Sequence, residues 1–139
     1  MHGLEVYLNG ALCSSAILGS SGGGTGVHQR SCIITETQCI VAVGDRIVAL
    51  SLPGLLIRWQ TKADEATCFG LHLSPDGLHV IVHGELAISM FTLDGELLWA
   101  FCGKDIFTGA CEVGGDTITV WDFNGDKYCI DIKTGRRAF

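Results

Sequence analysis

The sequence contains few charged residues and almost no proline. Only 17% of its 139 residues are charged and 2 are proline, whereas 47% are hydrophobic. A disordered chain is excluded, because such chains are polar and highly charged. A coiled coil is excluded as well, because it draws about half of its residues from Ala, Glu, Lys, Leu and Arg. The 19 glycines indicate many tight turns in a chain of single-domain length.

Basic residues are also scarce. Nine Lys and Arg stand against fifteen Asp and Glu, which gives a net charge of -6. Proteins that bind nucleic acid need clustered Lys and Arg to neutralise phosphates, so we do not expect DNA or RNA as a partner. An acidic surface suits a partner protein with a basic surface. The alternative is that the charge only keeps an apolar domain in solution.

Long hydrophobic runs and paired cysteine motifs are missing. No apolar run approaches the roughly 20 residues of a membrane span, so no membrane association is expected. The residues after Met1 do not read as a secretory signal, which predicts a cytoplasmic protein. Seven cysteines without a C-x-x-C pair argue against structural zinc. We therefore expect reduced thiols inside apolar strands, and neither a metal nor a cofactor.

An internal repeat of about 40 residues organises the chain. Gly54, Gly95 and Gly135 are 41 and 40 residues apart, and Trp59 precedes Trp99 by 40 residues. Each repeat holds four short strand-like runs separated by turn residues. In the middle repeat these runs span 68–74, 79–84, 86–92 and 96–101. Four strands in about 40 residues are typical of a propeller blade.

The repeat predicts an all-β fold of antiparallel four-stranded units, forming one β-propeller-like domain over residues 1–139. Asn9-Gly10 predicts a type I′ turn near the N-terminus, because both residues tolerate positive φ. The expected parts are an N-terminal hairpin over 1–18, a Gly/Ser loop over 19–26, and blade repeats over 27–62, 63–102 and 103–139.

Two blade motifs resemble known families. Leu73-Ser74-Pro75-Asp76-Gly77 resembles the strand-turn signature of WD-repeat propellers. Leu93-Asp94-Gly95-Glu96-Leu97-Leu98-Trp99 resembles the blade end of PQQ-like quinoprotein propellers, and Ile132-Lys133-Thr134-Gly135-Arg136 is similar to it. The resemblance covers about residues 31–139 and implies propeller blades.

The number of blades poses a problem of closure. The chain offers about three and a half blades, whereas propellers contain about four to eight. An open stack leaves its end sheets uncovered. Either two chains pair as a homodimer, or the chain closes as a small barrel or a stacked sandwich. We expect the homodimer, because symmetric pairs are the commonest oligomers.

The motifs that suggest catalysis or metal binding each lack a required part. Gly19-Ser20-Ser21-Gly22-Gly23 matches G-x-S-x-G, but no helix follows Ser21. His79 and His83 lie on one face of a predicted strand, about 13 Å apart, too far to share a metal unless His72 on the neighbouring strand assists. We expect no enzyme activity. Trp59 and Trp99 are expected to be structural, between adjacent blades.

Acidic residues in the turns of the second half are the candidate binding residues. They are Glu85, Asp94, Glu96, Asp122 and Asp126. The sequence therefore favours a non-enzymatic protein-binding module that acts through an acidic rim or through its strand edges. One alternative is a small acidic immunity protein that neutralises a basic, nuclease-type toxin. A second alternative, implied by the PQQ-like resemblance alone, is an enzyme subunit of that family.

Overall fold

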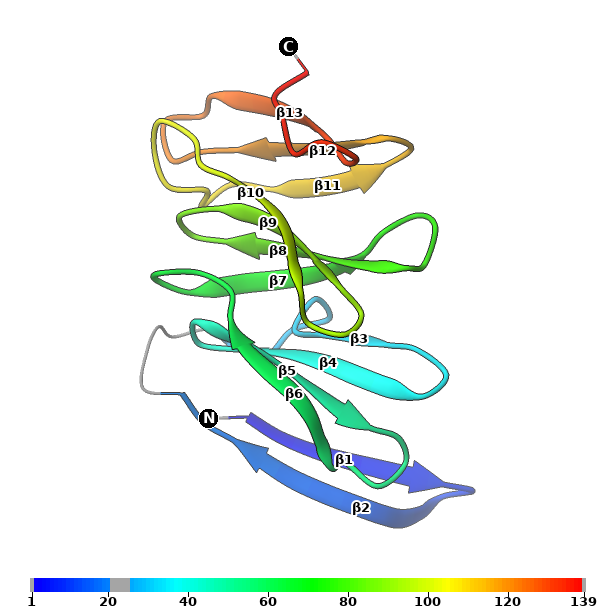
Figure 1. The fold of residues 1–139 in the computed structure, drawn as a ribbon. Helices are drawn as coiled ribbons and strands as arrows, with labels where there is room; N and C mark the ends of the chain where they lie inside the picture. Colours follow the sequence, from blue (N-terminus) through cyan, green and yellow to red (C-terminus); the bar gives the residue numbers. More distant parts are fainter. Residues whose placement is uncertain (1, 21–25, 139) are drawn as a thin grey trace.

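The computed structural model describes residues 2–20 and 26–138, and all of the regular elements in these ranges are β-strands. They form four antiparallel sheets, which lie one above another in chain order (Figure 1). The N-terminal hairpin pairs β1 (His2–Leu8) with β2 (Ala11–Leu18). This arrangement confirms the predicted all-β fold of antiparallel repeats.

Three larger sheets, here called blades 1 to 3, follow the hairpin. Blade 1 contains β3 (Cys32–Ile34), β4 (Gln38–Val43), β5 (Arg46–Ser51) and β6 (Ile57–Lys62). Blade 2 contains β7 (Cys68–Leu73), β8 (His79–Gly84), β9 (Ile88–Thr92) and β10 (Leu97–Phe101). Blade 3 contains β11 (Cys111–Gly114), β12 (Thr117–Trp121) and β13 (Lys127–Asp131). Strands follow sequence order across each sheet, so each blade is a meander.

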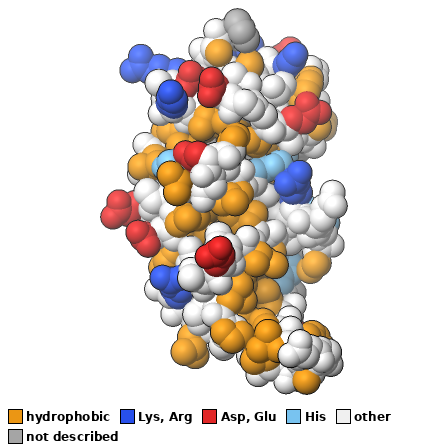
Figure 2. All heavy atoms as spheres, turned by 90° about the vertical axis from the view of Figure 1, so that its right-hand side faces the viewer, with side chains coloured by type: hydrophobic (Ala, Val, Ile, Leu, Met, Phe, Trp, Pro, Cys, Tyr) orange, Lys and Arg blue, Asp and Glu red, His pale blue; other side chains and the backbone are white. Residues whose placement is uncertain are grey.

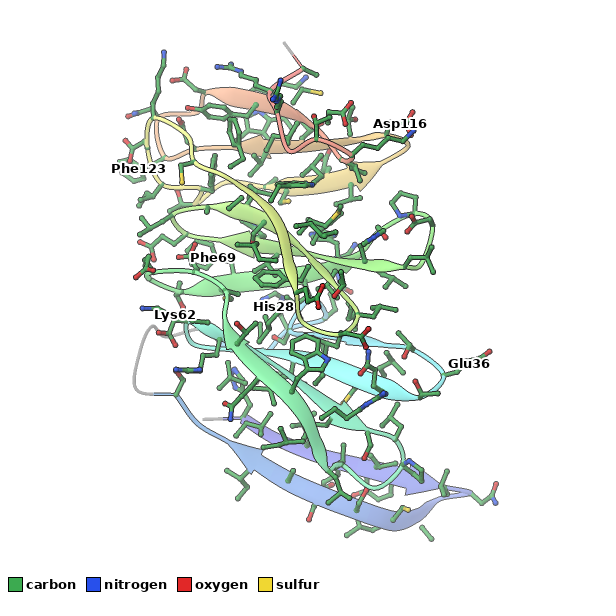
Figure 3. The ribbon with its side chains drawn as sticks, viewed as in Figure 1. His28, Glu36, Lys62, Phe69, Asp116 and Phe123 are labelled. Atoms are coloured by element: carbon green, nitrogen blue, oxygen red, sulfur yellow. The ribbon has the colours of Figure 1, made fainter. Side chains whose placement is uncertain are left out.

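The meander places alternate turns on opposite edges of the stack. One edge, here called the Asp116 rim, collects the turns at 9–10, 35–37, 52–56, 74–78, 93–96, 115–116 and 132–136. The opposite edge, here called the Phe123 rim, collects the segments 44–45, 63–67, 85–87, 102–110 and 122–126. In Figure 3, Glu36 and Asp116 mark the Asp116 rim at the right, and Lys62 and Phe123 mark the Phe123 rim at the left. The side formed by the first strands β3, β7 and β11 is called the inner face.

The core lies between the sheets. Side chains of β8 alternate: Val80 and Val82 pack against blade 1, whereas Ile81 packs with Ile118 and Ile130 of blade 3. In blades 1 and 2, neighbouring sheets cover both faces of the middle strands, so these strands are mostly apolar on both sides. All six residues of β4 are buried for this reason, since the hairpin covers its second face. The middle strand β12 of blade 3 instead alternates between buried and half-buried residues.

Tryptophans join successive blades, as the repeat predicts. The Trp59 indole N–H donates to Leu93 O at 2.9 Å, and the ring lies against Gly95. Trp99 repeats the contact one blade later, donating to Ile132 O at 2.8 Å beside Gly135. A Cβ at Gly95 would lie 2.8 Å from the Trp59 ring, so a side chain there would displace the indole. Gly95 also has a φ of 92°, in the left-handed region that favours glycine.

The N-terminal hairpin and blade 3 depart from the four-strand unit expected of each repeat. The hairpin corresponds to the third and fourth strands of a blade, because Ser14 on β2 donates to Pro53 O where Trp59 on β6 donates to Leu93 O. After the turn at Gly135, the described residues of blade 3 form an isolated bridge between Arg137 and Ile130 and no fourth strand.

Candidate binding surfaces

The structure does not bring the five candidate acidic residues together. Asp94 and Glu96 follow β9 and lie on the Asp116 rim. Glu85 follows β8, and Asp122 and Asp126 follow β12, so these three lie on the Phe123 rim. Antiparallel strands send consecutive turns to opposite edges, which the list of acidic turn residues did not take into account. Two rims, rather than one acidic rim, must therefore be compared.

Carboxylates on the Phe123 rim are used to hold the backbone. Asp64, only 5% exposed, accepts hydrogen bonds from the amides of Ala66, Thr67, Leu86 and Ala87, so it links the β6–β7 loop to the β8–β9 turn. Residue 84, which lies against this carboxylate, must be glycine, because a Cβ at Gly84 would lie 2.2 Å from an Asp64 oxygen. This carboxylate stabilises the fold and is closed to a partner.

Asp122 has a similar role in blade 3. It is 3% exposed and accepts hydrogen bonds from the amides of Asn124 and Asp126 and from the Tyr128 hydroxyl. The prediction that Asp122 belongs to a binding surface is therefore wrong, because its carboxylate is buried and accepts hydrogen bonds within the β12–β13 turn. Asp105 on the same rim accepts from Asn124 Nδ2 at 2.8 Å. Glu85 and Asp126 remain the candidate residues on this rim whose side chains make no hydrogen bond within the described ranges.

The Asp116 rim differs only in part. Asp76 and Asp131 also accept backbone hydrogen bonds within their own turns, Asp76 from the Leu78 amide and Asp131 from the Lys133 and Thr134 amides. Glu36, Asp94, Glu96 and Asp116 are exposed, and their carboxylates have no hydrogen-bond or ion-pair partner among residues 2–20 and 26–138. Apolar side chains lie between them: Leu8, Ile34, Leu56 and Leu78 are each between 53% and 74% exposed. Figure 2 looks onto this rim and shows hydrophobic side chains with isolated acidic ones among them.

The inner face is hollowed between the first strands. A cavity of about 420 Å³ is lined by Arg30, Phe69, His72, His83 and Cys111, together with His28, Gly70 and residues 108–110. Figure 3 labels His28 and Phe69 at this part of the stack. A second hollow adjoins it and shares Arg30, His72 and Cys111. The sequence suggested His72 and His83 as metal ligands at most, and did not mark Arg30, because Arg30 precedes β3 in a segment without a motif.

Burial favours the neutral form of two imidazoles of this cavity, those of His72 and His83. Burial lowers the pKa of His72 to about 4, and the positive charge of Arg30 adds to the effect. Burial also lowers the pKa of His83, against the opposing hydrogen bond from its ring to Phe107 O at 2.7 Å. His28 Nε2 lies 2.7 Å from Phe69 O. Arg30 therefore supplies the positive charge on this wall.

The described ranges contain no group of three or more His, Cys, Asp or Glu arranged to hold a metal ion. His79 instead pairs with Asp76 at 3.5 Å. Burial raises the pKa of both Cys68 and Cys111 to about 12, which keeps these thiols protonated. Ser21 of the G-x-S-x-G match lies outside the described residues. Residues 2–20 and 26–138 contain no helix that is long and apolar enough to cross a membrane.

Comparison with known proteins supports the fold and goes no further. No family model matches the sequence, and no curated protein matches it either. Among solved structures, the chain is similar to BamB from Moraxella catarrhalis, a β-propeller of the PQQ-like repeat type, with a TM-score of 0.70 and 19% sequence identity. The match covers 94% of this chain but 43% of BamB, so the chain spans less than half of the length of that protein. The chain therefore has a β-propeller-like fold.

Proposed function

We propose that the chain is a non-enzymatic β-propeller module that binds another protein through its Asp116 rim. The observation that supports this proposal is the alternation of exposed Ile34, Leu56 and Leu78 with carboxylates that have no partner in the described ranges. Monomeric proteins rarely expose a contiguous run of large apolar side chains, and such patches commonly mark interaction surfaces.

We infer the kind of partner from the chemistry of the Asp116 rim. Apolar side chains at the centre of an interface supply affinity, while the surrounding charges select the partner and speed its approach. A protein with a basic surface around an apolar patch fits this arrangement. The rim also presents turns rather than a strand edge, so contact through the rim differs from addition of a strand to the outer edge of β6 or β10.

A pulldown with two matched surface variants tests the proposal. The test variant combines Ile34→Ser and Leu78→Ser with Glu36→Lys on the Asp116 rim. The control combines Phe123→Ser with Glu85→Lys on the Phe123 rim, where Phe123 is 69% exposed. We expect the wild type and the control to retain the same basic partner at low salt and to release it at high salt. Retention by the test variant, or loss by the control, would contradict rim binding.

A strand-edge partner would give a different result in the same experiment. It would bind backbone groups, so it would survive both sets of side-chain changes and depend little on salt. This outcome would move the binding site from the rim to an edge strand.

We also propose that a second copy covers the open end of the stack. The outer face of the hairpin exposes Tyr7, Leu12 and Ile17, of which Ile17 is 74% exposed, whereas its inner face packs on blade 1. Light scattering tests this proposal directly. A dimer mass that falls to the monomer mass in Ile17→Lys is the expected result, and a monomer mass for the wild type at all concentrations would overturn it.

A further inference from the structure

The inner-face cavity contains Arg30, whose backbone is held by hydrogen bonds and whose side chain has no hydrogen-bond or ion-pair partner among residues 2–20 and 26–138. The amide of Leu71 donates to Arg30 O at 2.8 Å, and the amide of Arg30 donates to His28 Nδ1 at 3.1 Å. The segment crosses β7 at Gly70, where a Cβ would lie 3.0 Å from the Arg30 Cβ. Arg30 is therefore held in place against the first strand of blade 2.

The guanidinium of Arg30 forms no hydrogen bond or ion pair with the described residues. This is notable in a protein with fifteen acidic residues and a net charge of -6. Among the residues that line the adjoining hollow, Glu112 is the acidic one, and it forms no ion pair with Arg30. An unpaired guanidinium presents a planar set of donors that matches a carboxylate.

The other walls of the cavity suit the apolar part of a ligand that carries a carboxylate. The Phe69 ring contacts the His83 ring edge to face at 5.4 Å and leaves an apolar surface towards the cavity. His72 is 7% exposed, is neutral near pH 7 and has no hydrogen bond within the described ranges. A neutral imidazole donates or accepts one hydrogen bond without repelling an anion.

We propose that this cavity binds a small organic anion, with its carboxylate paired to Arg30 and its apolar part against Phe69. His72 supplies a further hydrogen bond to the same carboxylate. The site is separate from the Asp116 rim, so it stands or falls independently of the proposed protein-binding function. It is formed by residues before β3, on β7 and before β11, and thus requires the stacking of all three blades.

Benzoate and benzamide form a matched pair of probes. They have nearly the same shape, but benzoate carries the carboxylate. Backbone amide chemical shifts report binding, with Gly70, Leu71 and Gly109 as reporters beside the cavity. We expect saturable shifts of these signals with benzoate and none with benzamide. Equal shifts with both probes, or no saturable shift with benzoate, would overturn the proposal.

Two arginine variants assign the site. Arg30→Gln removes the charge without removing any side-chain hydrogen bond or ion pair with the described residues, so the fold should be kept, as its amide spectrum will show. We expect benzoate affinity to fall at least tenfold, or about 1.4 kcal/mol. Arg136→Gln, which removes an exposed charge on the Asp116 rim, should leave the affinity unchanged. Unchanged binding by Arg30→Gln, or equal loss in both variants, would contradict the assignment.

Discussion

The two rims of the stack carry acidic residues in different roles. On the Phe123 rim, Asp64 and Asp122 are buried and accept hydrogen bonds from several backbone amides and, for Asp122, from the Tyr128 hydroxyl. On the Asp116 rim, Glu36 and Asp116 are exposed, without partners in the described ranges and close to exposed apolar side chains. Asp76 and Asp131 on the Asp116 rim also accept backbone hydrogen bonds within their turns. What separates the rims in the described ranges is burial, because Asp64 and Asp122 are enclosed by the fold whereas Asp76 is exposed.

Replacing Asp64 should have the largest effect on stability. Asp64→Ala leaves four backbone amides of two loops without their acceptor, and hydrogen bonds to a charged group contribute about 1.5–3 kcal/mol each, though not additively. We expect the free energy of unfolding to fall by about 4 kcal/mol in urea denaturation. Asp116→Ala is the matched control and should change it by less than about 0.5 kcal/mol. Similar values for the two variants would abolish the distinction between the rims.

Asp122→Ala should destabilise blade 3 by a smaller amount. It removes the acceptor of three hydrogen bonds within one turn, whereas Asp64 joins two separate segments. We expect a loss of about 2–3 kcal/mol on thermal unfolding. Asp126→Ala, at an exposed position four residues further along the same turn, is the control. A loss below about 1 kcal/mol would mean that the turn at Asn124 forms without its carboxylate.

His72 should make the free energy of unfolding depend on pH, and this dependence must be distinguished from that of the carboxylates on the rims. Its pKa is about 4 in the folded protein and near 6.5 when unfolded, so the unfolded chain binds the proton more readily between these values. The contribution of His72 to the free energy of unfolding should therefore be highest above pH 6.5 and fall as the pH is lowered towards 4. We expect a fall of about 1–2 kcal/mol, since solvent at the open cavity screens part of the cost of charging the imidazole.

His72→Gln is the variant that measures this term. Its unfolding free energy should change less between pH 6.5 and pH 4 than that of the wild type, and the remaining slope belongs to the carboxylates and to His83. Identical pH profiles for the two proteins would show that His72 does not titrate in this way.

Changes on the Asp116 rim should have the smallest effect on stability. Leu78→Ser removes a side chain that is 62% exposed, so the unfolding free energy should change by less than about 0.5 kcal/mol. Leu71→Ser, seven residues earlier at a fully buried position of β7, is the contrasting control and should lose several kcal/mol. A marked loss in Leu78→Ser would mean that the rim is part of the core.

Much of the architecture was predictable because the repeat consists of short local patterns of residues. The spacing of Gly54, Gly95 and Gly135 and of the two tryptophans predicted the blades, and Asn9-Gly10 predicted its turn, where both residues have positive φ. These features depend on neighbours in the chain, which a sequence displays directly.

The candidate site was less predictable because it depends on which side of the sheet a residue faces. Asp122 and Asp94 are both acidic turn residues, yet one is buried on the Phe123 rim and the other exposed on the opposite rim. Arg30 lies against Gly70, forty residues later, and no local pattern marks that contact. The strand count of each meander would have assigned the rims, because each hairpin reverses direction.

Hydrogen exchange on the protein with its captured partner tests the division between the rims most directly. The partner should slow exchange in the segments 35–37, 74–78 and 93–96 of the Asp116 rim, while 63–67 and 85–87 exchange as in the free protein. Protection confined to the segments of the Phe123 rim would contradict the account.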